Sequence, residues 1–336
     1  MKWAAVVFVA LALALSFWLG RATAPVLESE LASVASFRRS LEDADWLTRS
    51  YRFSSFLVGL NPENLPDALE ALEPHLRWLL TDEFRIFMLA WSRFDPMGAF
   101  EQSQAWPPHI RRPAGGAAMY AWGFRNPLEA VRELTTVENT DLRAFFSRRL
   151  LAGWAHGEYR DSASEYIATL PDGPDQKRFI TTLVWEISKE GPEALKRWAD
   201  GVPDDLPSVK RAVFTEAAGS LAGVDAPSTA RWLRGHLDRD YAGDALLMLA
   251  GAWAFSDAPA AMSWLTGLPA GKQSKTAVRA GFTVWFNRSP ADAERWLRSA
   301  SPAPAVDSAV RFMVEQTQGE KPEVAREWAA RIAGEP

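Results

Sequence analysis

The sequence predicts an all-α fold, a right-handed α-solenoid of eight or nine helix pairs behind an N-terminal transmembrane helix. Three observations support this prediction. Tryptophan recurs at a step of about 32 residues, and a fixed step of this length is typical of stacked repeats. Prolines recur directly after Asp, Asn or Ser, a combination that favours the start of a helix. No segment shows the two-residue alternation of a half-buried strand.

The composition excludes several classes of protein. The 336 residues are 48% hydrophobic and 24% charged, as in chains that bury a core. The formal net charge of -5 argues against nucleic acid as a partner, because that binding needs a basic face. The chain has no cysteine, which excludes disulfides and Cys-zinc sites, and its four histidines are far apart in the sequence. We therefore expect no metal and no cofactor.

The chain opens with an uncharged apolar run from Ala4 to Gly20, which is just long enough to span a bilayer. An Ala-x-Ala pattern at 22–24 would suit a signal peptidase, but the following Pro25 fits its extended substrate poorly. We interpret residues 1–24 as a short tail and an uncleaved signal anchor, with a cleaved signal peptide as the alternative. An N-terminal anchor with so short a tail usually places the rest of the chain outside the cytoplasm. The prediction is a single-pass inner or plasma-membrane protein whose C-terminal domain is periplasmic or extracytoplasmic.

Residues 25–80 are predicted to be a polar helical stalk and a degenerate first repeat. That repeat covers 46–78, and its junction is the Asn-Pro pair at 61–62 or else Pro66. The regular aromatic step is found only beyond this point, so residues 81–336 are predicted to be the helical-repeat domain.

Two interleaved aromatic series define the repeat domain. The series in the second helix of each pair is Tyr166, Trp198, Trp232, Trp264, Trp296 and Trp328. The series in the first helix lacks a member near Leu221 and is Trp91, Trp122, Trp154, Trp185, Trp253 and Trp285. The second helices are predicted to start at Pro96, Pro127, Asp161, Pro192, Pro227, Pro259, Pro290 and Pro322. Trp buries a large apolar area, so we expect both series to lie in the core; a row of exposed platforms for a peptide or glycan is the alternative.

A unit of two helices with small residues, an aromatic anchor and a proline at the junction resembles the tetratricopeptide family, and more loosely the HEAT-type repeats. The string P-x-x-A-x-x-W-L at Pro290 shows the unit in this sequence. The resemblance covers about residues 81–336 and implies a concave surface that binds another protein or peptide. The Leu-Gly and Tyr positions of the tetratricopeptide pattern are not matched, so no binding residue of that family is carried over.

Two groups of residues are candidates for partner binding. The stretch 104–116 interrupts the repeats, and we predict a loop stiffened by three prolines whose binding residues are Trp106, His109, Arg111 and Arg112. A basic strip is predicted from the arginines that precede second-helix tryptophans, Arg197, Arg231 and Arg295. The alternatives are a longer connector whose Trp covers a helix end, and ordinary exposed charge.

No catalytic motif occurs in the sequence, and the H-x-D-x-D string at His236 is interpreted as a solvated turn rather than a metal site. The prediction is therefore a non-enzymatic scaffold or adaptor that binds a protein or peptide outside the cytoplasm. The alternatives are an envelope enzyme with a helical-repeat accessory domain, and a glycan or cell-wall binding protein that uses exposed tryptophans.

Overall fold

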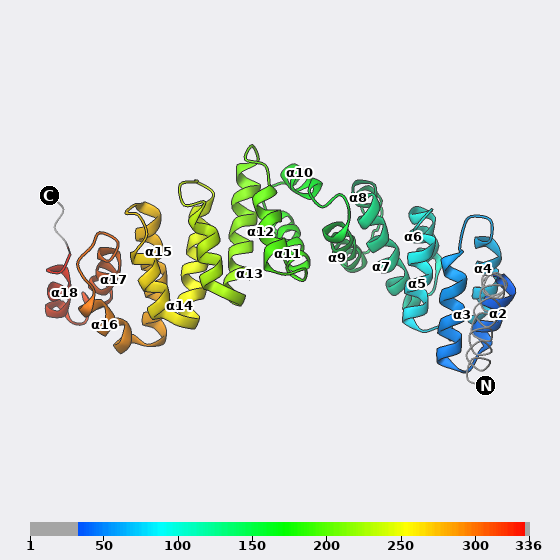
Figure 1. Cartoon of the computed structure of the whole chain (residues 1–336), viewed down its shortest axis with the longest axis horizontal. Helices are drawn as coiled ribbons and strands as arrows, with labels where there is room; N and C mark the ends of the chain where they lie inside the picture. The colour runs from blue at the N-terminus through cyan, green and yellow to red at the C-terminus, as the bar shows by residue number, and fades with distance from the viewer. Residues whose placement is uncertain (1–32, 333–336) are drawn as a thin grey trace, which may run out of the picture. The chain divides into compact units, whose positions relative to one another are not determined.

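The computed structural model describes residues 33–332, and the predicted membrane segment lies outside them. Within this range the chain is all-α: it forms α-helices and one 3-10 helix, and no strand. The helices pack mainly against helices that are near in sequence, as a helical repeat requires (Figure 1). The chain divides into two compact units, residues 1–159 and 160–336, which we call unit 1 and unit 2.

The described part of unit 1 holds eight α-helices. They are α2 (Val34–Glu42), α3 (Trp46–Val58), α4 (Leu65–Leu72), α5 (Thr81–Trp91), α6 (Pro96–Ala105), α7 (Pro108–Arg125), α8 (Pro127–Leu134) and α9 (Thr140–His156), with the 3-10 helix η1 (Glu73–His75) after α4. The first of these helices share an aromatic core, in which the ring of Phe37 stacks 4.4 Å from that of Phe56. Further along, Phe100 contacts Phe146 edge to face at 5.2 Å. Aromatic packing therefore joins α2 to α3 and α6 to α9.

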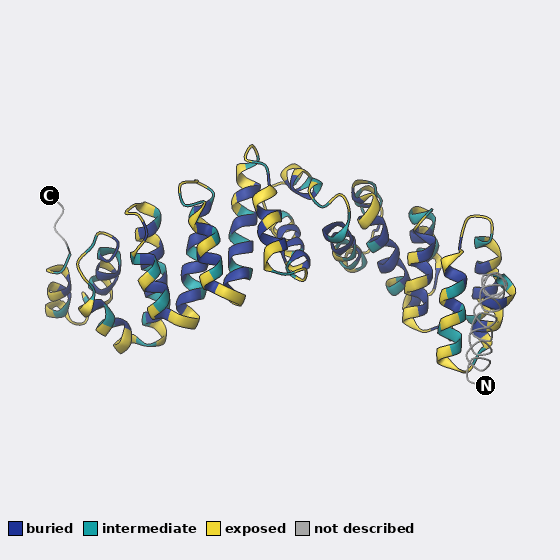
Figure 2. Ribbon diagram, in the orientation of Figure 1, coloured by how far each residue is buried: buried dark blue, intermediate teal, exposed yellow. Residues whose placement is uncertain are grey.

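The described part of unit 2 holds nine α-helices. They are α10 (Ser162–Thr169), α11 (Pro174–Ser188), α12 (Pro192–Gly201), α13 (Pro207–Arg234), α14 (Ala242–Thr266), α15 (Lys272–Arg288), α16 (Pro290–Ser299), α17 (Asp307–Thr317) and α18 (Pro322–Ala329). Two of them are merged pairs, because Asp225 in α13 and Asp257 in α14 have non-helical backbone angles. Figure 2 shows buried residues on the helix faces that meet their neighbours.

The predicted junctions between paired helices are confirmed. Asp95 accepts a hydrogen bond from the Gly98 amide at 2.9 Å and caps α6. Asp225 and Asp257 cap the second halves of α13 and α14 in the same way, at 2.9 and 3.1 Å. An acceptor side chain followed by proline starts a helix because it satisfies an orphan amide and fixes φ.

The first-helix aromatic series is confirmed except at Trp185, which is 59% exposed. The buried stripe of α11 contains Ile180, Leu183, Val184 and Ile187. Since successive helical residues are about 100° apart, Trp185 points away from that stripe, and Ile187 takes the core place two residues later. The prediction of Trp185 as a core anchor was wrong.

In the second-helix series, the three tryptophans Trp232, Trp264 and Trp296 occupy equivalent places and are half-buried rather than fully buried. The leucine that follows each of them is completely buried: Leu233, Leu265 and Leu297. The core of these three second helices is therefore centred on Leu, and the indole covers its edge. Trp198 and Trp328 are themselves buried.

Helix α14 is the one helix among the described residues that is long and apolar enough to cross a membrane. Half of its apolar stretch is buried within the protein, and Asp257 interrupts the helix. Its hydrophobic composition is explained by burial against α13 and α15. The segment boundaries expected near residues 24 and 80 stay predictions.

Candidate functional site

The connection between α13 and α14, residues 235–241, carries an imidazole, a phenol, carboxylates and an apolar side chain. His236 and Tyr241 pack toward α13, where both rings contact Phe214 at centroid distances of 4.9 and 4.7 Å. Leu237 and Asp238 instead line a cavity that reaches α14 and α15. This connection therefore joins a polar cluster on one side to a pocket on the other.

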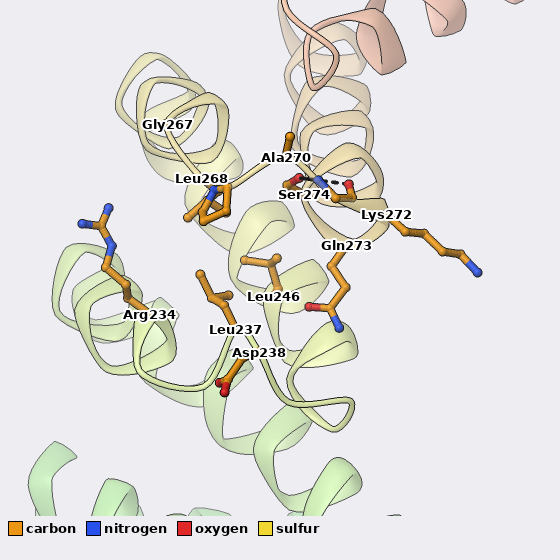
Figure 3. Close-up of a pocket in the computed structure, with 12 residues that line it drawn as sticks. Arg234, Leu237, Asp238, Leu246, Gly267, Leu268, Ala270, Lys272, Gln273 and Ser274 are labelled. Atoms are coloured by element: carbon orange, nitrogen blue, oxygen red, sulfur yellow. Dashed lines mark hydrogen bonds between the residues drawn. The ribbon is translucent and has the colours of Figure 1, made fainter.

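The pocket has a volume of about 750 Å³ and lies where α13, α14 and α15 approach one another. Leu237, Leu246 and Leu268 converge on its apolar floor (Figure 3). Its rim carries Arg234, Asp238, Lys272 and Gln273. A concave apolar floor with a few polar groups at the rim is typical of a site that accepts a side chain of a ligand.

The wall of the pocket is fixed by the short loop between α14 and α15. Pro269 follows the end of α14 at Thr266, and its ring and missing amide disfavour a further helical turn. The Gly271 amide then donates a hydrogen bond to Oγ of Ser274 at 3.0 Å, and that hydroxyl donates back to the Gly271 carbonyl at 3.0 Å. These two bonds hold the start of α15 beside the pocket.

The polar cluster is centred on Asp200, at the end of α12. Its Oδ1 accepts a hydrogen bond from Nε1 of Trp232 at 3.0 Å and lies 3.3 Å from Nε2 of His236. The other ring nitrogen of His236, Nδ1, lies 3.0 Å from the hydroxyl of Tyr241. When Nε2 donates to the carboxylate, Nδ1 is the acceptor and the tyrosine hydroxyl is its donor.

A lysine completes this cluster. Lys210 pairs with Asp204, and the hydrogen bond and the charge of the ammonium group lower the pKa of that carboxyl. The Lys210 ammonium also lies 5.0 Å from the ring centroid of Tyr241. Burial raises the pKa of the Tyr241 hydroxyl, although the lysine opposes this effect. Tyr241 therefore stays neutral at neutral pH, and its hydroxyl is available to hydrogen-bond Nδ1 of His236.

The interpretation of the H-x-D-x-D string is only partly confirmed. Asp238 and Asp240 are exposed, as expected for a solvated turn, but His236 is half-buried and hydrogen-bonded. Among the described residues, no group of three or more His, Asp or Glu side chains is placed to hold a metal ion.

The loop predicted at 104–116 was wrong. Helix α7 begins at Pro108 and continues through Pro113, and Trp106 is buried against the ring of Phe84 at 5.7 Å. Pro113 has no amide hydrogen to donate to the carbonyl of His109, four residues earlier. Because His109 is exposed, water can donate to that carbonyl instead.

Only part of the predicted binding group in this segment faces solvent. His109 and Arg112 are exposed, and the Arg112 guanidinium lies 4.5 Å from the ring centroid of Phe145. Arg111 is half-buried and lies 3.5 Å from the carbonyl of Trp106. The structure therefore separates these side chains between a buried face and an exposed face of α7.

The three arginines of the predicted strip are all exposed: Arg197, Arg231 and Arg295. Arg295 pairs with Asp292 at 2.7 Å, which offsets its charge. The arginine at the pocket rim is Arg234, which sequence reasoning missed. Its position just before Gly235, at the end of a helix, was the only available signal.

Comparison with family models, curated proteins and solved structures gives no match for this chain.

Proposed function

We propose that the chain is a right-handed α-solenoid, anchored in the inner or plasma membrane by residues 4–20, that acts as a scaffold or adaptor outside the cytoplasm. Its partner is a protein or peptide, and the α13–α15 pocket accepts an apolar side chain of that partner. The pocket is the observation that carries this proposal, because it is concave, apolar at its floor and bordered by charged groups.

The two sides of the α13–α14 connection support a binding role together. The cluster of Asp200, His236 and Tyr241 fixes the connection by hydrogen bonds on one side. Leu237 is thereby presented to the pocket on the other side. A preorganised wall lowers the entropy that binding would otherwise lose.

The aromatic ladders give less support to a glycan-binding role. The members of both series are buried or half-buried except Trp185, so they do not form a row of open platforms. Each helix packs mainly against helices near it in sequence, and the aromatic residues recur at a nearly fixed step. Both features favour a solenoid, a fold whose extended surface suits a peptide.

Site-specific crosslinking tests this proposal. Because the chain has no cysteine, Gln273→Cys in the full-length protein can carry a single benzophenone label at the pocket rim. Gln316→Cys, on exposed α17 surface of the same unit, is the matched control. We expect illumination of native membranes to give a discrete protein adduct from position 273 alone.

A second variant tests whether the adduct from position 273 depends on the pocket. Leu237→Arg places a long charged side chain on the apolar floor, so the adduct from position 273 should disappear. Adducts that are the same from both labelled positions, or that persist in this variant, would contradict a partner site in the pocket.

A further inference from the structure

One edge of unit 1 exposes large apolar side chains at the starts of two neighbouring helices. In the first turn of α3, Trp46 and Leu47 are exposed; just before α5, Trp78 and Leu80 are exposed. Figure 2 shows exposed residues at both helix starts. We call these four residues the α3–α5 edge. Exposed apolar groups gathered in this way mark an interaction surface.

An ion pair places the two helix starts together. Nε of Arg49 lies 2.5 Å from Oε1 of Glu83, and a second nitrogen of the guanidinium donates to Oε2 at 2.9 Å. Both partners lie within the first turn of their helices, and the same carboxylate accepts from the Leu80 amide at 2.8 Å. This bidentate contact is largely buried, so it holds the two starts side by side.

The position of the edge in the chain indicates what covers it. The predicted membrane segment ends at Gly20, and only residues 21–32 separate it from the described chain. Twelve residues span at most about 40 Å when fully extended. If Ala4–Gly20 is the anchor, unit 1 is tethered close to the bilayer, at a high effective concentration with respect to it.

We propose that the α3–α5 edge rests on the membrane, with its side chains in the headgroup region of the bilayer. This inference rests on the membrane anchor of the proposed function. Tryptophan is enriched at membrane interfaces because its ring is apolar and its N–H is polar, and leucine adds apolar contact beneath it.

The charges near the edge point to insertion rather than attraction to acidic lipid. Within each of three pairs near the edge the opposite charges cancel: Arg49–Glu83, Arg52–Asp43 and Arg85–Asp82. The exposed residues beside the two tryptophans, Arg77 and Asp45, are also of opposite charge. A contact without excess positive charge depends little on anionic headgroups or on salt. The edge should therefore bind zwitterionic phosphatidylcholine.

A pair of labelled positions on α3 tests this contact. Leu47 and Val58 are 76% and 77% exposed on the same helix and on the same stripe, about 16 Å apart along its axis. Leu47→Cys and Val58→Cys, each in the full-length protein, carry a single fluorescent label in phosphatidylcholine vesicles. Lipid-borne nitroxide then reports contact with the bilayer, and aqueous iodide reports contact with water.

We expect nitroxide to quench the label at position 47 at least threefold more strongly than the label at 58, and iodide to show the reverse order. Changing both Trp46 and Trp78 to Ser should abolish the difference while the protein stays in the vesicles. Equal quenching at both positions in vesicle-bound protein would overturn the inference and leave the anchor intact.

Two other outcomes are equally decisive. Shielding of position 47 from iodide without quenching by lipid would show that protein, such as a second copy of the chain, covers the edge, and would overturn the inference. Release of the protein from vesicles by an alkaline wash would show that residues 4–20 do not anchor it. The proposed function would then fail, and the membrane contact inferred from it would fail too.

Discussion

Gly153 in α9 lies directly against the main-chain carbonyl of Tyr120 in α7, and a Cβ added at Gly153 would stand 2.0 Å from that oxygen. The contact is reciprocal, because a Cβ at Gly123 of α7 would stand 2.2 Å from the carbonyl oxygen of Leu150 in α9. The two helices therefore pack backbone to backbone, and only glycine allows this approach.

We expect Gly153→Ala to destabilise unit 1 by about 1–3 kcal/mol, because the helices must separate to admit a methyl group. Gly223→Ala is the matched control: a Cβ there meets nothing within 4 Å, and alanine favours a helix interior over glycine by about 1 kcal/mol. Thermal unfolding followed by circular dichroism should show a lower Tm for the first variant only. Equal Tm values would contradict the close approach.

A pair of tryptophan substitutions separates the core from the surface. Trp154 is completely buried and its Nε1 donates to the Tyr159 carbonyl at 2.9 Å, whereas Trp185 is exposed. We expect Trp154→Ala to lower the free energy of unfolding by about 3–5 kcal/mol and Trp185→Ala to change it by less than about 0.5 kcal/mol. Urea titrations measure both values, and a large loss from Trp185→Ala would show that this side chain is covered.

The interior of unit 2 is predicted to open most easily in α13, at residues 214–223. Gly219 and Gly223 lower helix propensity by roughly 1 kcal/mol each, and the first-helix aromatic series has no tryptophan here. We expect amides of 214–223 to exchange hydrogen faster than those of 277–286 in α15. The competing interpretation is close packing, since a Cβ added at Gly219 would lie 3.1 Å from the terminal methyl group of Met248. Equal protection of the two segments would favour it.

One ion pair in unit 2 predicts a small loss of stability in acid. Two nitrogens of Arg279 donate to the carboxylate of Glu315, at 2.9 and 2.5 Å, and this hydrogen bonding lowers the pKa of Glu315 in the folded state. The contribution is therefore present above the usual glutamate pKa and is lost as the pH falls through and below it. Because the pair is exposed, it amounts to less than about 1 kcal/mol.

We expect Glu315→Gln to reduce the difference in unfolding free energy between pH 6 and pH 3, measured by urea titration. Glu320→Gln, at an exposed turn of the same unit, is the control. A pH dependence unchanged by Glu315→Gln would show that the pair contributes nothing measurable.

The membrane anchor predicts both retention and topology. We expect the full-length protein to stay with membranes after a high-salt wash, because apolar insertion is insensitive to screening. A reporter fused after Pro336 should be active only outside the cytoplasm. A mature soluble chain that begins near residue 23 or 25 would show instead that the segment is a cleaved signal peptide.

The structural details that the sequence predicted correctly are local ones. A capping side chain and a following proline act within one helical turn, so Asp95, Asp225 and Asp257 mark helix starts whatever surrounds them. The all-α class follows from the same local signals repeated along the chain. Which face of a helix is buried depends on contacts that are less local. In α11 the regular tryptophan step predicted that Trp185 is buried, although Ile187 is the buried residue and Trp185 is exposed.

Tertiary structure alone decided the rest, because it depends on which side chains meet across helices. Pro113 continues α7 instead of ending it, since the packing of that helix outweighs one missing hydrogen bond. The pocket exists only where Leu237, Leu246 and Leu268 converge from three parts of the chain. Likewise, Asp200 contacts His236, which is 36 residues later in the sequence. No rule of residue spacing predicts a contact at that separation. The sequence period determined the order of helices along this chain, and side-chain contacts between the helices determined where its pocket lies.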